Sequence, residues 1–333
     1  MYYEEELTQA EIARRSGYSR SMISRFLAEA RRQGVVEIRV HHPMERRTDL
    51  EQALRHRFSL KRVRVLDCYS HEYTARLRRV GMLAARLVEE TVTDHMTIGM
   101  SWGTGLAEMV QACRPQPRNG VLVVQIIGSM GTANPNIDGS ELARQLAHVF
   151  GGRYRILPTP LIVEDESVRR GLRSDRQVRE VLDHAWTMDL ALVGIGTVER
   201  EFSSLVRSGY LKPEELAEFA EAGAVGDVCT IHFDIYGNLI DTPLQRRFMG
   251  IDYETLARVP TRIGIAAGQP KAEAILGALR AGMINVLVTD DVAATHVLRL
   301  ADWTEAGSRA PLYNSVTCGR TIVYGRSPGV PDS

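Results

Sequence analysis

Four short segments of this 333-residue sequence combine glycine with side chains that can bind a polar ligand, and each follows an apolar run. They span residues 98–105, 128–138, 194–197 and 266–271. Small residues let the backbone approach an anion, and the free N–H groups of a following helix favour its charge. Together with one aspartate outside them, these segments supply the residues expected at a ligand: Gly99, Ser101, Trp102, Gly103, Thr104, Gly105, Ser129, Asp138, Asp227, Gly268 and Lys271.

Lys271 and Asp227 bring opposite charges to this set. Lys271 falls in the first turn of a predicted helix, where a cation opposes the helix dipole, so an anionic ligand explains its position better than folding does. A solvated surface lysine is the alternative. Asp227 follows two glycines, and its carboxylate can accept hydrogens from the hydroxyls of a polyol. Asp234 has the same chemistry, but its Asp-x-x-Gly setting favours an ordinary hairpin turn.

Segment 98–105 lacks the two best-known phosphate-binding patterns. No G-K-[ST] sequence follows it, so it is not a P-loop, and it lacks the G-x-G-x-x-G spacing of dinucleotide-binding proteins. A tight strand-to-helix turn without a ligand is therefore the alternative to an anion site.

A second group of polar residues, near the N-terminus, has the chemistry of DNA binding. Residues 8–15 predict a short helix that begins with a capping box formed by Thr8 and Glu11. Gly17 then allows a tight turn. Ser19 then caps a second helix that ends near residue 32, before a wing strand at 35–40. This is the helix-turn-helix plan, with a helical hairpin used only for packing as the alternative. The residues expected at DNA are Thr8, Gln9, Ser19, Arg20, Ser21, Ser24 and Arg25.

The charge distribution agrees with this prediction. Residues 1–65 hold 14 basic and 9 acidic residues, whereas the remaining 268 hold 27 basic and 32 acidic ones. A basic head on an acidic body indicates that the head meets a polyanion. A solvated basic helix face is the alternative explanation of the charge alone.

The body of the sequence alternates strands and helices. Apolar runs such as VLVVQII and LALVGIG predict parallel strands that helices cover on both faces. We therefore expect an α/β protein with a doubly wound, Rossmann-like effector domain, in which ligands lie beyond the carboxyl ends of the strands. The expected domains are a head at 1–42, a linker with a connecting helix at 43–60, the large domain at 61–325 and a tail at 326–333. The expected strands are 62–66, 96–100, 121–127, 153–157, 190–195, 262–267 and 285–288, and the helices 73–91, 105–113, 139–150, 174–186, 213–222, 269–281 and 291–300.

Composition excludes several classes of protein. With 44% apolar and 25% charged residues the chain is typical of a soluble globular protein, and no uncharged run reaches the roughly 18 residues that a membrane span needs. The N-terminus has no apolar signal region. The four cysteines are far apart, which favours reduced thiols in a cytoplasmic protein. We expect no metal or cofactor, since the His41–His42 pair has no further ligands at useful spacing.

The head contains the stretch LTQAEIARRSGYSRSMISRFLAEARRQGVVEI, which follows the Tyr2-Tyr3 pair. This stretch resembles the head of the SorC family of sugar-sensing bacterial transcription regulators. Family members usually carry another helix upstream of this pair, so we expect either a start codon upstream of Met1 or a head without that helix.

The body is similar to the effector domain of the same family. The matching stretches are GMSWGTGL, VVQIIGSMG, ALVGIGTV, GAVGDVCTIHFDIYGNLID and GIAAGQPKAEAILGALRAGMINVLVTDDVAA. The resemblance implies a sugar, polyol or sugar-phosphate effector that contacts Ser101 to Thr104, Asp227 and Lys271. Trp102 stands where many relatives have a small residue, and its ring either stacks on a sugar face or narrows the phosphate pocket.

Two classes of function remain to be weighed, a regulator and a sugar-phosphate isomerase-like enzyme with an accessory head. An isomerase needs a base with a pKa near 7 beside the ligand. Asp290 and Asp291 precede a helix, where N-capping explains them. The regulator is therefore favoured, as a homodimer or homotetramer with operator DNA as its partner. His148, His184, His232 and His296 all lie outside the four segments.

Overall fold

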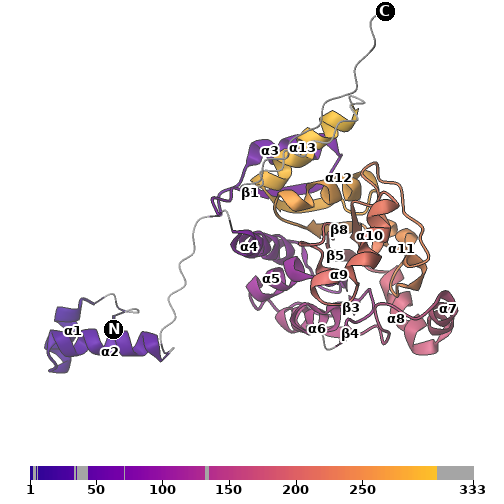
Figure 1. Cartoon of the computed structure of the whole chain (residues 1–333). Helices are drawn as coiled ribbons and strands as arrows, with labels where there is room; N and C mark the ends of the chain where they lie inside the picture. The colour runs from indigo at the N-terminus through magenta and orange to yellow at the C-terminus, as the bar shows by residue number, and fades with distance from the viewer. Residues whose placement is uncertain are drawn as a thin grey trace, which may run out of the picture. The chain divides into compact units, whose positions relative to one another are not determined.

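The computed structural model describes residues 1–2, 5, 7–33, 35, 44–70, 72–131 and 135–305. The chain divides into two compact units, Met1–Met44 and Glu45–Ser333, and each is described by itself (Figure 1). The predicted wing strand, apart from its first residue, and the His41–His42 pair lie outside the described residues.

The first unit is built on two helices, α1 (Gln9–Ser16) and α2 (Arg20–Arg32). The Thr8 side chain accepts from the Glu11 N–H while the Glu11 carboxylate accepts from the Thr8 N–H, so the predicted capping box is present. Gly17 ends α1 with φ +74°, a left-handed conformation that glycine adopts at little cost. Ile12 and Ile23 are buried between the two helices.

The second unit contains a seven-stranded parallel sheet in the order β1-β9-β8-β5-β2-β3-β4. A separate antiparallel hairpin pairs β6 with β7. Strands β2, β3 and β4 follow one another towards one edge, whereas β5, β8 and β9 run towards the other. The strands are β1 (Arg62–Leu66), β2 (Thr97–Met100), β3 (Leu122–Gln125), β4 (Arg153–Arg155), β5 (Leu190–Gly194), β6 (Gly226–Val228), β7 (Ile231–Phe233), β8 (Thr261–Ile265) and β9 (Val286–Asp290).

Helices cover both faces of this sheet, as its apolar strands require. α4 (Tyr73–Thr91), α5 (Thr104–Ala112) and α6 (Gly139–Val149) pack on one face. They lie together beside the strands in Figure 1. The remaining helices are α3 (Thr48–Arg57), α7 (Glu166–Ser174), α8 (Arg176–Trp186), α9 (Ser204–Arg207), α10 (Pro213–Glu221), α11 (Tyr253–Arg258), α12 (Ala272–Arg280) and α13 (Asp291–Glu305), with 3₁₀ turns η1 (Pro135–Ile137), η2 (Gln245–Arg247) and η3 (Gln269–Lys271).

The predicted doubly wound α/β fold is confirmed, and the expected strands and the helix of α4 are present where the periodicity placed them. The predicted helix at 174–186 is wrong at its start. Asp175 has extended backbone and accepts from the N–H groups of Gln177 and Val178, so it caps α8 and separates it from α7. The predicted helix at 269–281 is also corrected, because it begins with the η3 turn.

Within the described residues, no helix is both long and apolar enough to span a membrane. In the same part of the chain, no three His, Cys, Asp or Glu side chains gather in a way that could hold a metal ion.

Candidate functional site

A cavity lies where the order of the strands reverses, between the carboxyl ends of β2 and β5. Loops leave these neighbouring strands in opposite directions, and the crevice this creates is the usual ligand site of doubly wound sheets. Three of the four predicted segments meet there; segment 128–138 does not line the cavity. The lining residues are Tyr73, Leu77, Ser101, Trp102, Gly103, Thr104, Gly105, Gly194, Ile195, Gly196, Thr197, Ser203, Ser204, Leu205, Asp227, Cys229, Ile265, Ala266, Ala267 and Lys271.

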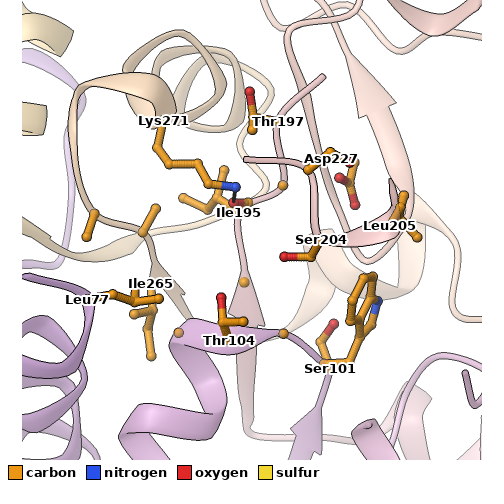
Figure 2. A pocket seen from close by; sticks show the side chains of 18 of the residues that line it. Leu77, Ser101, Thr104, Ile195, Thr197, Ser204, Leu205, Asp227, Ile265 and Lys271 are labelled. Atoms are coloured by element: carbon orange, nitrogen blue, oxygen red, sulfur yellow. Dashed lines mark hydrogen bonds between the residues drawn. The ribbon is translucent and has the colours of Figure 1, made fainter. Parts of the chain in front are cut away.

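The junction of β2 and α5 forms the floor of the cavity as Figure 2 presents it. Gly103 has φ +126° and precedes α5, so a side chain at this position would strain the backbone. Ser101 and Trp102 are buried, and Thr104 begins the helix. The junction therefore presents hydroxyl groups and an indole ring to the space above it, together with the N-terminal end of α5.

Lys271 is buried, with 6% of its surface exposed, and its amine faces the cavity. Nζ donates to the carbonyl oxygen of Ile195 at 3.0 Å. Burial lowers the pKa of the amine to about 8, because desolvation outweighs the attraction of Asp227 and Glu199. No carboxylate of the described residues lies within 4.0 Å of this amine. A bound group that is anionic or rich in hydrogen-bond acceptors would therefore stabilise the protonated amine of Lys271.

Asp227 enters the cavity from the opposite side, on the β6–β7 hairpin (Figure 2). Its carbonyl accepts from the Gly196 N–H at 2.8 Å, which ties the hairpin to the loop after β5. Only glycine fits at position 196, because an added Cβ would lie 1.7 Å from the Asp227 carboxylate. That carboxylate also accepts from the Thr230 N–H at 3.1 Å.

The hairpin that carries Asp227 turns sharply. Cys229 and Thr230 have φ +52° and +63°, values that β-branched and other bulky residues rarely adopt. The Cys229 thiol is buried, which raises its pKa to about 12, while a hydrogen bond with Ser101 acts in the opposite direction. Such a thiol stays protonated at neutral pH and is a poor nucleophile.

Four predicted ligand residues lie outside the lining of the cavity. Gly99 sits inside β2, where a Cβ would lie 2.4 Å from the Met188 sulfur. Ser129 accepts through its hydroxyl from the Gln125 amide at 3.0 Å. These positions pack the sheet beneath the cavity and the loop after β3.

Asp138 and Gly268 hold backbone in place. The Asp138 carboxylate caps α6 through the N–H of Ser140 and also accepts from the N–H of Met130. Gly268 donates its N–H to the carboxylate of Asp290 at 2.5 Å. Both residues therefore shape loops whose neighbours approach the cavity, and neither lines it.

Three further expectations concern aspartates outside the set. Asp234 accepts from the N–H groups of Tyr236 and Asn238, so the predicted hairpin turn is confirmed. Asp290 accepts from the N–H groups of Val292 and Ala293, which confirms its N-capping role at α13. The same expectation is wrong for Asp291, whose carboxylate instead accepts from the Cys68 N–H and pairs with Arg76.

Sequence reasoning missed the residues that reach the cavity from outside the four segments. Tyr73 and Leu77 come from the start of α4, and Ser203 to Leu205 come from the cap and first turn of α9, after β5. The Tyr73 ring packs edge-on against Phe202 with centroids 5.1 Å apart, which joins these two walls. None of these residues stands in a recognisable pattern, and only the packing of α4 on the sheet brings them to the site.

No histidine among the described residues lines the cavity. His232 is stacked on Phe219 with ring centroids 3.7 Å apart, and Gln245 holds its Nδ1 at 2.7 Å. Burial lowers the pKa of His232. The cavity thus combines hydroxyls, one amine and one carboxylate, a set suited to binding a hydroxylated ligand.

The first unit presents its predicted DNA-contacting residues to solvent. Thr8, Ser19, Arg20, Ser21, Ser24 and Arg25 are exposed and Gln9 is half-buried. Arg20 and Arg25 have no carboxylate partner among the described residues, so their guanidinium groups can pair with a polyanion. Ser19 accepts from the N–H of Met22 at 3.2 Å, which places it at the start of α2 as predicted.

Comparisons with known proteins agree with this arrangement. The Sugar-bind family, "Putative sugar-binding domain", matches residues 42–299. The Deoxyribonucleoside regulator of Bacillus subtilis is 31% identical over 88% of this chain and 93% of its own length. The Sorbitol operon regulator of Klebsiella pneumoniae is 30% identical over 90% of this chain and 95% of its own length.

A solved structure extends the similarity to three dimensions. The full-length Sorbitol Operon Regulator SorC of Klebsiella pneumoniae superposes with a TM-score of 0.73 at 29% identity, covering 89% of this chain and 95% of that one. The family match, these relatives and the doubly wound fold lead to one conclusion. This chain belongs to the SorC family of transcriptional regulators, with a sugar-binding domain in its second unit.

Proposed function

We propose that this protein binds operator DNA through α1 and α2 and changes its affinity for that DNA when a sugar, polyol or sugar phosphate occupies the cavity beside Lys271. The relatives are regulators of a sorbitol operon and of deoxyribonucleosides, which points to ligands of this class. The protein acts in the cytoplasm, where its operator is, and it catalyses no reaction.

One observation carries this proposal: a buried, protonatable Lys271 and the Asp227 carboxylate face each other across a hydroxyl-lined cavity at the switch point of the sheet. Hydroxyl and carboxylate groups recognise the hydroxyls of a sugar, and the amine recognises its acceptors or a phosphate. The residues that we assign to the effector are Ser101, Trp102, Gly103, Thr104, Gly105, Asp227 and Lys271. Gly99, Ser129, Asp138 and Gly268 support them through the backbone.

The cavity supports binding rather than catalysis. A sugar-phosphate isomerase needs a base with a pKa near 7 beside the ligand. The described lining has no histidine, and its thiol is protonated because burial raises the pKa of Cys229 to about 12. The Lys271 amine, with a pKa of about 8, is mostly protonated at neutral pH and is therefore no base there.

The switch is a shift between two arrangements of the large domains. Two or four chains associate through these domains, and paired heads contact the half-sites of a near-palindrome. A ligand that binds one arrangement better changes the affinity for DNA by that difference, typically about 1–3 kcal/mol.

The test uses the purified protein and a labelled DNA fragment from its own promoter. Thermal shifts are measured with sorbitol, 2-deoxyribose and their phosphates, because a compound that binds only the folded protein raises the melting temperature. Compounds that stabilise the protein are then titrated into the complex with DNA, followed by fluorescence anisotropy. We expect one of them to change the affinity for DNA without being consumed. Turnover of a sugar phosphate, or no salt-sensitive binding to the promoter, would overturn the proposal.

A further inference from the structure

Asp290 lies outside the lining of the effector cavity, and it holds the backbone of the loop that leads to Lys271. Its side chain is fully buried, at 0% exposure, at the end of β9. One carboxylate oxygen accepts from the Gly268 N–H at 2.5 Å, and the other accepts from Val292 and Ala293 at the start of α13. Asp290 thus fastens the loop that leads into Lys271 to the first turn of a helix.

Arg76 of α4 neutralises this carboxylate and extends the connection. One of its terminal nitrogens lies 2.8 Å from Asp290 and 3.3 Å from Asp291. The other donates to the carbonyl oxygen of Ser70 at 2.7 Å. Asp291 in turn accepts from the Cys68 N–H at 3.3 Å. The loop after β1 is therefore held by Arg76 and Asp291, and Arg76 also pairs with Asp290, which holds the Lys271 loop.

The loop after β1 also contacts the first residues of the second unit. The Asp67 N–H donates to the Glu45 carbonyl at 2.8 Å, and the Tyr69 hydroxyl donates to the Glu45 carboxylate at 3.0 Å. Glu45 is the residue at which the second unit begins, directly after the unit that carries α1 and α2. Hydrogen bonds and ion pairs, joined through the backbone of residues 67–70, thus connect the Lys271 loop to Glu45, where the second unit begins.

We infer that the buried Asp290–Arg76 pair positions the Lys271 loop for its ligand and links that loop to the start of the effector domain at Glu45. Both residues act through others: Asp290 through the Gly268 backbone, and Arg76 through Ser70 and Asp291. They are positioning residues. The positioning part of this inference stands without the proposed function, whereas the linking part rests on it.

The first experiment measures positioning without sugar or DNA. Lysine occurs only at positions 61, 212 and 271, so acetylation by acetic anhydride can be followed at each site by mass spectrometry. In Asp290→Asn the side chain keeps its size but has one acceptor oxygen fewer, so it cannot serve Gly268 and α13 together. We expect acetylation of Lys271 to become about fivefold faster relative to Lys61 and Lys212, as its loop loosens.

Two controls separate positioning from other effects. Asp175→Asn makes the same change at the cap of α8, outside the lining of the cavity, and should leave all three rates unchanged. The Lys271 amine donates to the Ile195 carbonyl and not to Asp290, so loss of the Asp290 charge removes no hydrogen bond of the amine. A rate ratio that persists from pH 7 to pH 10 confirms that access, and not titration, has changed.

The second experiment measures the link. Arg76→Lys keeps a positive charge for Asp290, but a single ammonium cannot reach Asp290, Asp291 and the Ser70 carbonyl at once. Because the ammonium still balances the Asp290 charge, Asp290 keeps its contact with the Gly268 N–H, and we expect acetylation of Lys271 and the thermal shift with sorbitol, 2-deoxyribose or their phosphates to stay close to the wild type. The change in DNA affinity caused by the same compound should fall by about fivefold or more, within the usual range of coupling energies.

The outcomes distinguish the two parts. A folded Asp290→Asn protein with unchanged Lys271 acetylation, or with equal increases at all three lysines, would overturn the positioning role. If Asp290→Asn does not fold, the milder Asp290→Glu, which displaces the same carboxylate, is judged by the same ratio. An Arg76→Lys protein with a full DNA response would overturn the link. If the wild type shows no sugar response at all, the proposed function has failed, and the acetylation ratio alone decides the positioning role.

Discussion

The Lys271 amine is buried, and within the protein it donates to one carbonyl oxygen, that of Ile195. Arginine accounts for 38 of the 41 basic residues of the chain, so the lysine in the cavity is an uncommon choice here. The two side chains differ in the way this site requires. The pKa of a buried lysine falls readily, whereas arginine stays protonated and needs several acceptors.

A prediction about stability follows from the lowered pKa of Lys271. The folded value is about 8 and the ordinary value 10.5, so below pH 8 the folded protein holds a proton in a poorly solvating site. This penalty is relieved as pH rises from 8 to 10.5, where the unfolded chain binds more protons than the folded one. Lys271→Met should therefore be more stable than the wild type at pH 7, by about 2 kcal/mol.

Urea unfolding of both proteins at pH 7 and pH 10.5 checks this. The stability difference should shrink at the higher pH, while the exposed Lys212→Met control should show no such trend. A constant difference across this range would show that the amine is not penalised by burial.

At the scale of the element, Gly17 at the end of α1 and Gly171 within α7 have open space around them. Substitution of each by alanine therefore measures the effect of backbone conformation on helix stability without a steric clash. Gly17 ends α1 with φ +74°, and an added Cβ there meets nothing within 4 Å. Gly17→Ala therefore isolates the cost of left-handed backbone, about 1 kcal/mol, and should destabilise the head. Amide hydrogen exchange of residues 9–32 in the full chain should become faster, and binding to promoter DNA weaker. Unchanged exchange would mean that the turn does not limit the stability of the head.

Gly171 provides the opposite case within α7. An added Cβ there also meets nothing within 4 Å, and the position is helical. Gly171→Ala should stabilise the protein by roughly 0.5–1 kcal/mol, because alanine loses less backbone freedom in a helix. A higher urea midpoint with an unchanged slope is the expected result, whereas a lower midpoint would contradict the assignment of α7 as a regular helix.

At the scale of the whole molecule, we expect substitutions in the first unit to impair DNA binding and substitutions in the second unit to impair sugar binding. Arg25→Ala should weaken promoter binding by about tenfold and reduce its salt dependence, while the thermal shift with sugars stays intact. Lys271→Ala should abolish the thermal shift and leave sugar-free DNA binding near the wild-type value. Anisotropy titrations at two salt concentrations and a melting series measure both. Parallel loss of both activities in either variant would contradict the division of labour between the units.

Much of the architecture is legible in the sequence because it depends on local patterns. The capping box at Thr8 and Glu11, the apolar strands and the hairpin at Asp234 are each set by residues close together in the chain. Runs such as LALVGIG predict the parallel sheet, because a strand that is apolar on both faces must be covered by helices on both sides. The switch-point rule then places a site at the strand ends before any contact is known.

Which residues line the cavity depends on the tertiary structure, because segments far apart in the chain meet at one edge of the sheet. Tyr73 and Ser203 enter the cavity from a helix and a loop without a motif. Ser129 and Asp138 lie in the segment after β3, where they contact the Gln125 amide and the Met130 backbone instead. The burial that sets the state of Lys271 and the contacts that Asp290 makes behind it also arise only in the packed molecule. Residue type gives the possible chemistry, and packing decides which groups are desolvated and brought together.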